Sequence, residues 1–153
     1  FGLPFAALLI KPEHDIWKPA EHNGTFRGNT HAFVTARVAI EKFWADDAFQ
    51  KEIAIKSDVL SAGLKDVAEL VDGASIKGRG MMQGVDVGSG DLAGDICARA
   101  YELGLVVETS GPNDEVVKIL ATLTTSEQLF CEGFAILSTA AREVAAKTKI
   151  AAQ

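Results

Sequence analysis

The stretch that decides the fold is SIKGRGMMQGVDV, residues Ser75–Val87. In its second half, apolar or amide side chains alternate with small or acidic ones, and this two-residue period predicts a β-strand. The glycines at positions 78, 80 and 84 predict a bulge or a close approach of another backbone. The segments on either side have a helical period instead, so the stretch indicates a mixed α/β fold.

Working outward from this strand, the sequence predicts a small domain over residues 46–153. Gly104 stands where a helix next to the strand would end, and Thr125 with Gln128 forms a capping box for the last helix. The expected elements are a helix from Asp46 to Gly73, the strand Ser75–Val87, a helix ending at Gly104, strands Leu105–Thr109 and Val116–Leu120 around the turn Ser110–Asp114, and a C-terminal helix. The domain is therefore predicted to be a mainly antiparallel three-stranded sheet covered by helices.

Residues 1–45 are predicted to be the edge of a larger domain, followed by a linking helix. The apolar run Ala6–Ile10 lies between two prolines and predicts a short buried strand. The segment Thr30–Trp44 has one apolar face, and Asn29 before it is a good N-cap because its side chain accepts hydrogen bonds from free backbone N–H groups. Since the chain enters the apolar run almost directly, we expect it to be the C-terminal part of a longer polypeptide.

The composition and charge of the chain argue against several classes of protein. Of the 153 residues 48% are hydrophobic, which is enough for a buried core. The formal net charge of −6 argues against a nucleic-acid partner or an anionic membrane surface. No apolar run approaches the roughly 20 residues of a membrane helix, and the basic segment of a signal peptide is not visible. These features predict a cytoplasmic protein in which Cys97 and Cys131 are reduced thiols of the core, with a disulfide or metal pair as the minor alternative.

The segment GTFRGN, residues Gly24–Asn29, is the first candidate binding site because it lies directly before a helix. Helix N-termini attract phosphate through unpaired N–H groups and a partial positive charge. The two glycines let the backbone approach an anion, the hydroxyl of Thr25 can donate a hydrogen bond, and Arg27 adds charge. The segment lacks the lysine and the spacing of a P-loop, so a plain capped loop is the alternative.

Lys118 is the second candidate, because a lysine inside the apolar strand VVKIL must pair, reach water or face a cleft. An edge-strand lysine that discourages aggregation is the structural alternative. His14, His22 and His31 lack a carboxylate or thiol at ligand spacing, so no metal site is predicted. No Ser-His-Asp set, Cys-His set or pair of carboxylates can be argued from the sequence, so no catalytic residue is assigned in this chain.

Three segments resemble the class III, or omega-type, aminotransferases, which use pyridoxal phosphate. They are GLPFAALLIKPEHDIWKPAEHNGTFRGNTHAFVTARVAIEKF, IKGRGMMQGVDV and LGLVVETSGPNDEVVKILATLT. The most specific parts, GTFRGN and ETSGPNDEVVK, resemble the diaminobutyrate–2-oxoglutarate transaminases of ectoine biosynthesis, a pathway of osmoadaptation. The resemblance implies a fold type I transferase, with residues 1–45 at the edge of the large cofactor-binding domain and residues 46–153 in the C-terminal small domain.

The resemblance also implies an activity and partners. The reaction is the transfer of an amino group from L-glutamate to L-aspartate 4-semialdehyde, which gives 2-oxoglutarate and L-2,4-diaminobutyrate. The assembly is a homodimer or a dimer of dimers, in which Thr25 and the backbone at Phe26 bind the phosphate of the partner subunit's cofactor. Lys118 stands where many relatives carry an arginine for the substrate carboxylate, although a lysine cannot make the bidentate fork of arginine.

The resemblance places the lysine that holds the cofactor covalently before Phe1. Lys11 and Lys18 lie after the matching position and are not assigned that role. The isolated chain is therefore not expected to catalyse transamination. Two other interpretations stay open, namely a transaminase for ornithine or 4-aminobutyrate, and a non-catalytic α/β module for interaction or oligomerisation.

Overall fold

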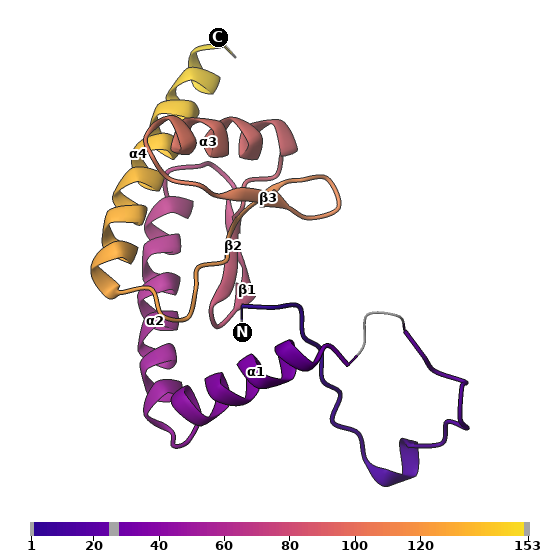
Figure 1. Cartoon of the computed structure of the whole chain (residues 1–153). Coiled ribbons are helices and arrows are strands. Elements are labelled where there is room, and N and C mark those ends of the chain that lie inside the picture. Colours follow the sequence, from indigo (N-terminus) through magenta and orange to yellow (C-terminus); the bar gives the residue numbers. More distant parts are fainter. Residues whose placement is uncertain (1, 25–27, 152–153) are drawn as a thin grey trace. The chain divides into compact units, whose positions relative to one another are not determined.

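The computed structural model describes residues 2–24 and 28–151 (Figure 1). The chain divides into two compact units, Phe1–Gln50 and Lys51–Gln153. The sequence places the division between residues 45 and 46, and that assignment of domains stays a prediction. Each unit is described here by itself.

The first unit contains one turn of 3-10 helix, η1 (Pro12–His14), and the helix α1 (Thr30–Phe43). The predicted cap of α1 is confirmed, because the Asn29 side chain accepts hydrogen bonds from the backbone N–H groups of His31 and Ala32 at 3.1 and 3.3 Å. These bonds satisfy two of the donors that a helix start leaves unpaired. The helix therefore begins where the sequence predicts and ends one residue earlier.

The predicted buried strand Ala6–Ile10 is wrong. These residues are exposed and have no regular secondary structure, and Leu9 is 99% exposed. A strand is stabilised by hydrogen bonds to a neighbouring strand, and the described part of this unit contains none. Within this unit, the apolar composition of Ala6–Ile10 is therefore not accompanied by a strand.

The second unit is built on an antiparallel sheet, and it includes most of the helix α2 (Ala48–Ala68). The strands are β1 (Ser75–Arg79), β2 (Met82–Asp86), β3 (Glu108–Ser110) and β4 (Val116–Ile119), in the spatial order β1-β2-β4-β3. The prediction of a single strand over Ser75–Val87 is wrong, because this stretch forms the β1–β2 hairpin. Positive φ angles at Gly78 and Gly80 allow the turn, so the described sheet has four strands instead of three.

The core of the second unit lies on one face of the sheet. Ile76, Val85 and Val117 are register partners on adjacent strands and point to this face. The helices α2, α3 (Gly90–Glu102) and α4 (Glu127–Ala151) lie on this side (Figure 1). Their most deeply buried side chains share one core with the strands, namely Leu60, Leu64, Ala93, Ile96, Ala100, Leu137, Ala140 and Ala141. The mixed α/β class with an antiparallel sheet is thus confirmed.

The ends of α3 and α4 test two further predictions. Gly104 has φ +97° directly after the C-cap of α3, as expected for a C′ glycine. The predicted capping box of α4 is wrong, because the backbone N–H of Leu129 donates to the Ser126 hydroxyl and not to Thr125. The Thr125 hydroxyl is paired with that of Thr122 at 2.9 Å. Two adjacent hydroxyl residues can both serve as the cap, and the sequence does not choose between them.

An ion pair joins α3 to α4 on the outside of the second unit. The Arg99 Nε atom lies 2.6 Å from Glu143 Oε2, and its Nη1 atom lies 2.7 Å from Glu102 Oε2. The hydrogen bond from Arg99 holds the pKa of the Glu143 carboxyl below its usual value. Both carboxylates are substantially exposed, so we expect the contacts of Arg99 to contribute little to the stability of the unit.

The two cysteines are free and differ in environment. Cys97 on α3 is half-buried, and burial raises the pKa of its thiol, which therefore stays protonated at neutral pH. Cys131 on α4 is exposed, so the prediction that it belongs to the core is wrong. Within the described residues, no helix has both the length and the apolar character needed to cross a membrane.

Candidate functional site

Lys118 projects from the face of the sheet that the helices do not cover. It lies on β4 with Gly84 of β2 as its register partner on one side and Glu108 of β3 on the other. Because side chains alternate along a strand, Lys118 points away from the core that Val117 enters. β4 is an inner strand, so the interpretation of Lys118 as an edge-strand lysine is wrong.

The ammonium of Lys118 forms an ion pair with the carboxylate directly across the strands. Its Nζ atom lies 2.8 Å from Glu108 Oε1. The side chain of Lys118 is 25% exposed, whereas that of Glu108 is 67% exposed. Lys118 is therefore largely covered by neighbouring residues, whereas the carboxylate of Glu108 remains accessible to solvent and to a ligand.

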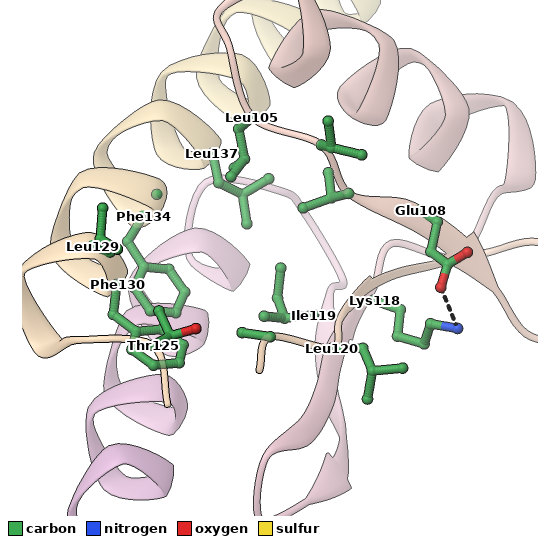
Figure 2. Close-up of a pocket in the computed structure, with 14 residues that line it drawn as sticks. Leu105, Glu108, Lys118, Ile119, Leu120, Thr125, Leu129, Phe130, Phe134 and Leu137 are labelled. Carbon is green, nitrogen blue, oxygen red and sulfur yellow. Dashed lines mark ion pairs between the residues drawn. The ribbon is translucent and has the colours of Figure 1, made fainter. Parts of the chain in front are cut away.

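A cavity of about 330 Å³ opens beside this pair, between the β3–β4 edge of the sheet and α4. Figure 2 shows Leu105, Ile119, Phe130, Phe134 and Leu137 around the cavity, with the Glu108–Lys118 pair at its sheet side. Mostly apolar walls with a few polar groups are typical of small-molecule sites.

Lys118 also borders a second hollow, of about 350 Å³, over the uncovered face of the sheet. Lys77 lies on the far side of Gly84 in the same row of register partners. The Lys77 ammonium is already bound to Asp86 Oδ2 at 2.6 Å, and this hydrogen bond raises the pKa of Lys77. Gly84 has no side chain, so it leaves a gap on this face between the Lys77–Asp86 ion pair and the Lys118–Glu108 ion pair.

The predicted cofactor residues Thr25 and Phe26 lie outside the described residues. Next to them, Gly28 has φ +74° with no atom within 4 Å of the place that a Cβ would take, so its backbone is open to a close approach. The nearby hollow is lined by Pro4, Phe5, Ala6, Gly28, Asn29, Ala32 and Phe33, a set without a cation. The Asn29 side chain already accepts hydrogen bonds from the backbone N–H groups of two residues in the first turn of α1. The backbone at Gly28 could therefore contact a phosphate. The described residues around it include no cation that would balance the charge of that phosphate.

Two side chains of interest were missed from the sequence. Glu108 lies within the specific segment ETSGPNDEVVK, but its pairing with Lys118 depends on strand register. Lys56 on α2 is buried, with 7% of its side chain exposed, and its Nζ atom lies 2.6 Å from Glu52 Oε1 and donates to the Leu123 carbonyl at 2.9 Å. Its spacing of four residues from Leu60 on the apolar stripe is the signal that could have revealed it.

The described residues contain no group of three or more His, Cys, Asp or Glu side chains that could hold a metal ion. His14, His22 and His31 are exposed. At the described site, Lys118 and Glu108 present one charge of each sign beside a mostly apolar cavity.

Solved aminotransferases share this fold. N-acetylornithine aminotransferase from Stenotrophomonas maltophilia matches with a TM-score of 0.61 and 26% identity, over 80% of this chain and 32% of that one. Ornithine delta-aminotransferase from Plasmodium falciparum matches with a TM-score of 0.65 and 19% identity, over 86% and 34% of the two chains. The chain thus has the fold of one part of a fold type I aminotransferase.

The sequence places the chain within that class. The pattern of aminotransferase class-III matches residues 1–141, and the chain belongs to this family. The diaminobutyrate–2-oxoglutarate transaminase of Halomonas elongata is 44% identical over 147 residues, which are 94% of this chain and 35% of the relative. That of Vibrio cholerae is 46% identical over 139 residues, 90% of this chain and 34% of the relative. The chain spans about one third of the length of these curated relatives.

Proposed function

We propose that these residues belong to a cytoplasmic diaminobutyrate–2-oxoglutarate transaminase. The reaction moves an amino group from L-glutamate to L-aspartate 4-semialdehyde and yields L-2,4-diaminobutyrate and 2-oxoglutarate. The observation that carries the proposal is the 44–46% identity, over nearly the whole chain, with relatives of that name. Membership in the class-III family favours an enzyme over a non-catalytic module.

In this proposal the chain contributes substrate binding and part of a cofactor site. Lys118 holds a substrate carboxylate, and its position on an inner strand fixes where that carboxylate lies. The apolar cavity beside it limits the access of water to the bound ligand. Pyridoxal phosphate, when bound, supplies the electron-withdrawing ring on which amino groups are exchanged. The lysine that holds it covalently is expected outside these residues, as the resemblance implies.

The proposal is tested by the choice of amino acceptor. The full-length, cofactor-loaded enzyme is assayed with L-glutamate as donor and either aspartate 4-semialdehyde or succinic semialdehyde as acceptor. We expect kcat/KM to be much higher with aspartate 4-semialdehyde. A preference for succinic semialdehyde would support a 4-aminobutyrate transaminase instead. An ornithine-type enzyme, which the similarity to an N-acetylornithine aminotransferase keeps as the runner-up, would prefer glutamate 5-semialdehyde.

The role of Thr25 is tested separately. We propose that its hydroxyl binds the phosphate of the partner subunit's cofactor in a homodimer or a dimer of dimers. Thr25→Ala in the full-length enzyme should weaken the binding of pyridoxal phosphate by about 1–3 kcal/mol, since a hydrogen bond to a charged group is lost. The dissociation constant is measured from cofactor absorbance after equilibrium dialysis. Thr139→Ala is the control, because that hydroxyl only donates to the Ala135 carbonyl of its own helix. Equal cofactor affinity in the two variants would contradict the proposed role of Thr25 in binding the phosphate.

A further inference from the structure

Lys56 is a buried cation that the proposed substrate site does not use. It belongs to the buried stripe of α2, together with Leu60 and Leu64, and only 7% of its side chain is exposed. Such a helix position normally carries an apolar residue, because an ammonium loses its hydration when it is buried. Specific partners must offset this loss, and they show which part of the unit the ammonium contacts.

The Lys56 ammonium has one partner on its own helix and one far along the chain. Its Nζ atom lies 2.6 Å from Oε1 of Glu52, one turn earlier on α2. It also donates a hydrogen bond to the Leu123 carbonyl oxygen at 2.9 Å. Glu52 is exposed, so water can solvate its carboxylate without Lys56, whereas the bond to Leu123 joins two distant segments of the unit.

The Leu123 carbonyl belongs to the connection between β4 and α4, residues 120–126. This connection contains a turn in which the Thr125 N–H donates to the Thr122 carbonyl at 3.0 Å, and the hydroxyls of the same two residues are paired. These bonds are local and hold the turn only to itself. The bond from Lys56 spans 67 residues and holds the turn to α2.

The same connection forms one wall of the cavity beside Lys118. Leu120 and Thr125, both labelled in Figure 2, line this cavity together with Ala121. Leu120 follows Lys118 by only two residues. A shift of the connection would therefore move the cavity wall next to the cation that we propose binds the substrate.

We infer that Lys56 is a positioning residue of the substrate site, which holds the connection 120–126 and thereby one wall of the cavity beside Lys118. The inference rests on the proposed function, in which this cavity limits the access of water to the bound ligand. Lys56 acts through a backbone carbonyl and not through contact with the ligand. A neutral side chain of similar size would fill the same space but would leave the connection free to move.

The test is Lys56→Met in the full-length, cofactor-loaded enzyme. Methionine fills a similar space without a donor, and an apolar replacement of a buried charge is often tolerated by the fold. We expect amide hydrogen exchange in the peptide 120–126 to become roughly tenfold faster, as for loss of a charged hydrogen bond, while exchange in α3 is unchanged. KM for L-glutamate and for aspartate 4-semialdehyde should rise by about 3- to 10-fold, with kcat within about twofold of the wild type.

Two control variants isolate the bond to Leu123. Lys65→Met makes the same substitution at an exposed position of the same helix and should change neither exchange nor KM. Glu52→Gln removes the charge of the exposed partner and leaves the bond to Leu123, so the connection should stay protected. Thermal unfolding verifies that each variant is folded. If Lys56→Met does not fold, Lys56→Gln, whose neutral amide tolerates water, replaces it in the same comparison.

The outcomes separate this inference from the proposed function. Unchanged exchange at 120–126, or equally faster exchange throughout the second unit, would overturn the positioning role of Lys56. Faster exchange confined to the connection, with KM unchanged, would overturn its link to the substrate site. If the wild-type enzyme rejects aspartate 4-semialdehyde, the proposed function fails. KM is then measured with the acceptor that the enzyme does accept, and together with the exchange comparison it still decides the role of Lys56.

Discussion

Gly78→Ala is expected to lower the free energy of unfolding by about 2–5 kcal/mol. Gly78 has φ +94°, a conformation that costs a residue with a Cβ roughly 1–2 kcal/mol. The added Cβ would also lie 2.2 Å from the Met82 carbonyl oxygen and 2.8 Å from the Gln83 Cα atom. Both are backbone atoms of the partner strand, so the hairpin must deform, at a further cost of about 1–3 kcal/mol. Urea unfolding followed by circular dichroism measures the loss.

Gly80→Ala is the matched control for this prediction. Gly80 lies in the same hairpin and has φ +63°, but nothing lies within 4 Å of the place of its Cβ. Its substitution should cost only the roughly 1–2 kcal/mol of the backbone conformation. Equal losses at positions 78 and 80 would contradict the close approach of the two strands at Gly78.

Leu64→Ala should lower the free energy of unfolding by about 2–5 kcal/mol, because a fully buried leucine leaves a cavity that its neighbours fill only in part. Leu64 is 0% exposed and belongs to the core that α2 shares with the sheet and with α3 and α4. The variant is compared with the wild type by the midpoint and slope of urea unfolding. An unchanged slope assigns the change to stability.

Leu129→Ala controls for the loss of a leucine as such. Leu129 lies on α4 and is 57% exposed, so its truncation should change the free energy of unfolding by no more than about 0.5 kcal/mol. If Leu64→Ala cost as little as Leu129→Ala, the core of the second unit would not be packed around α2 as described. The two variants together therefore test the arrangement and not the composition of the helices.

The sequence predicts the existence of the helices well, because each has an apolar period, but it predicts their ends unevenly: α2 was expected to reach Gly73 and ends at Ala68. Asn29 and Gly104 act as the sequence indicates, since a cap depends on residues within one turn. The sheet was less predictable. Ser75–Val87 was expected to be one strand because the glycines at 78 and 80 are equally consistent with a bulge and with a turn.

Where the sequence fails, the deciding contacts lie far away along the chain. Ala6–Ile10 has the composition of a strand, and strand formation depends on a neighbour that composition does not specify. The candidate site likewise depends on contacts between separate strands. Lys118 was a candidate because a lysine is unusual in an apolar strand, but its partner Glu108 follows only from the register of β3 on β4. Thr25 and Phe26 stay predictions, since they lie outside the described residues.

The inner position of β4 has a mechanical consequence for any ligand held by Lys118. Hydrogen-bonded neighbours on both sides, at Gly84 and Glu108, fix the backbone that carries the ammonium. Segments of this kind open only with the cooperative unfolding of their whole unit, whereas edge segments fray locally. The ammonium of Lys118, which we propose binds the substrate carboxylate, is therefore carried by the more rigid part of the unit. Adaptation to substrates of different length must then come from side-chain rotation or from the other elements that surround the ligand.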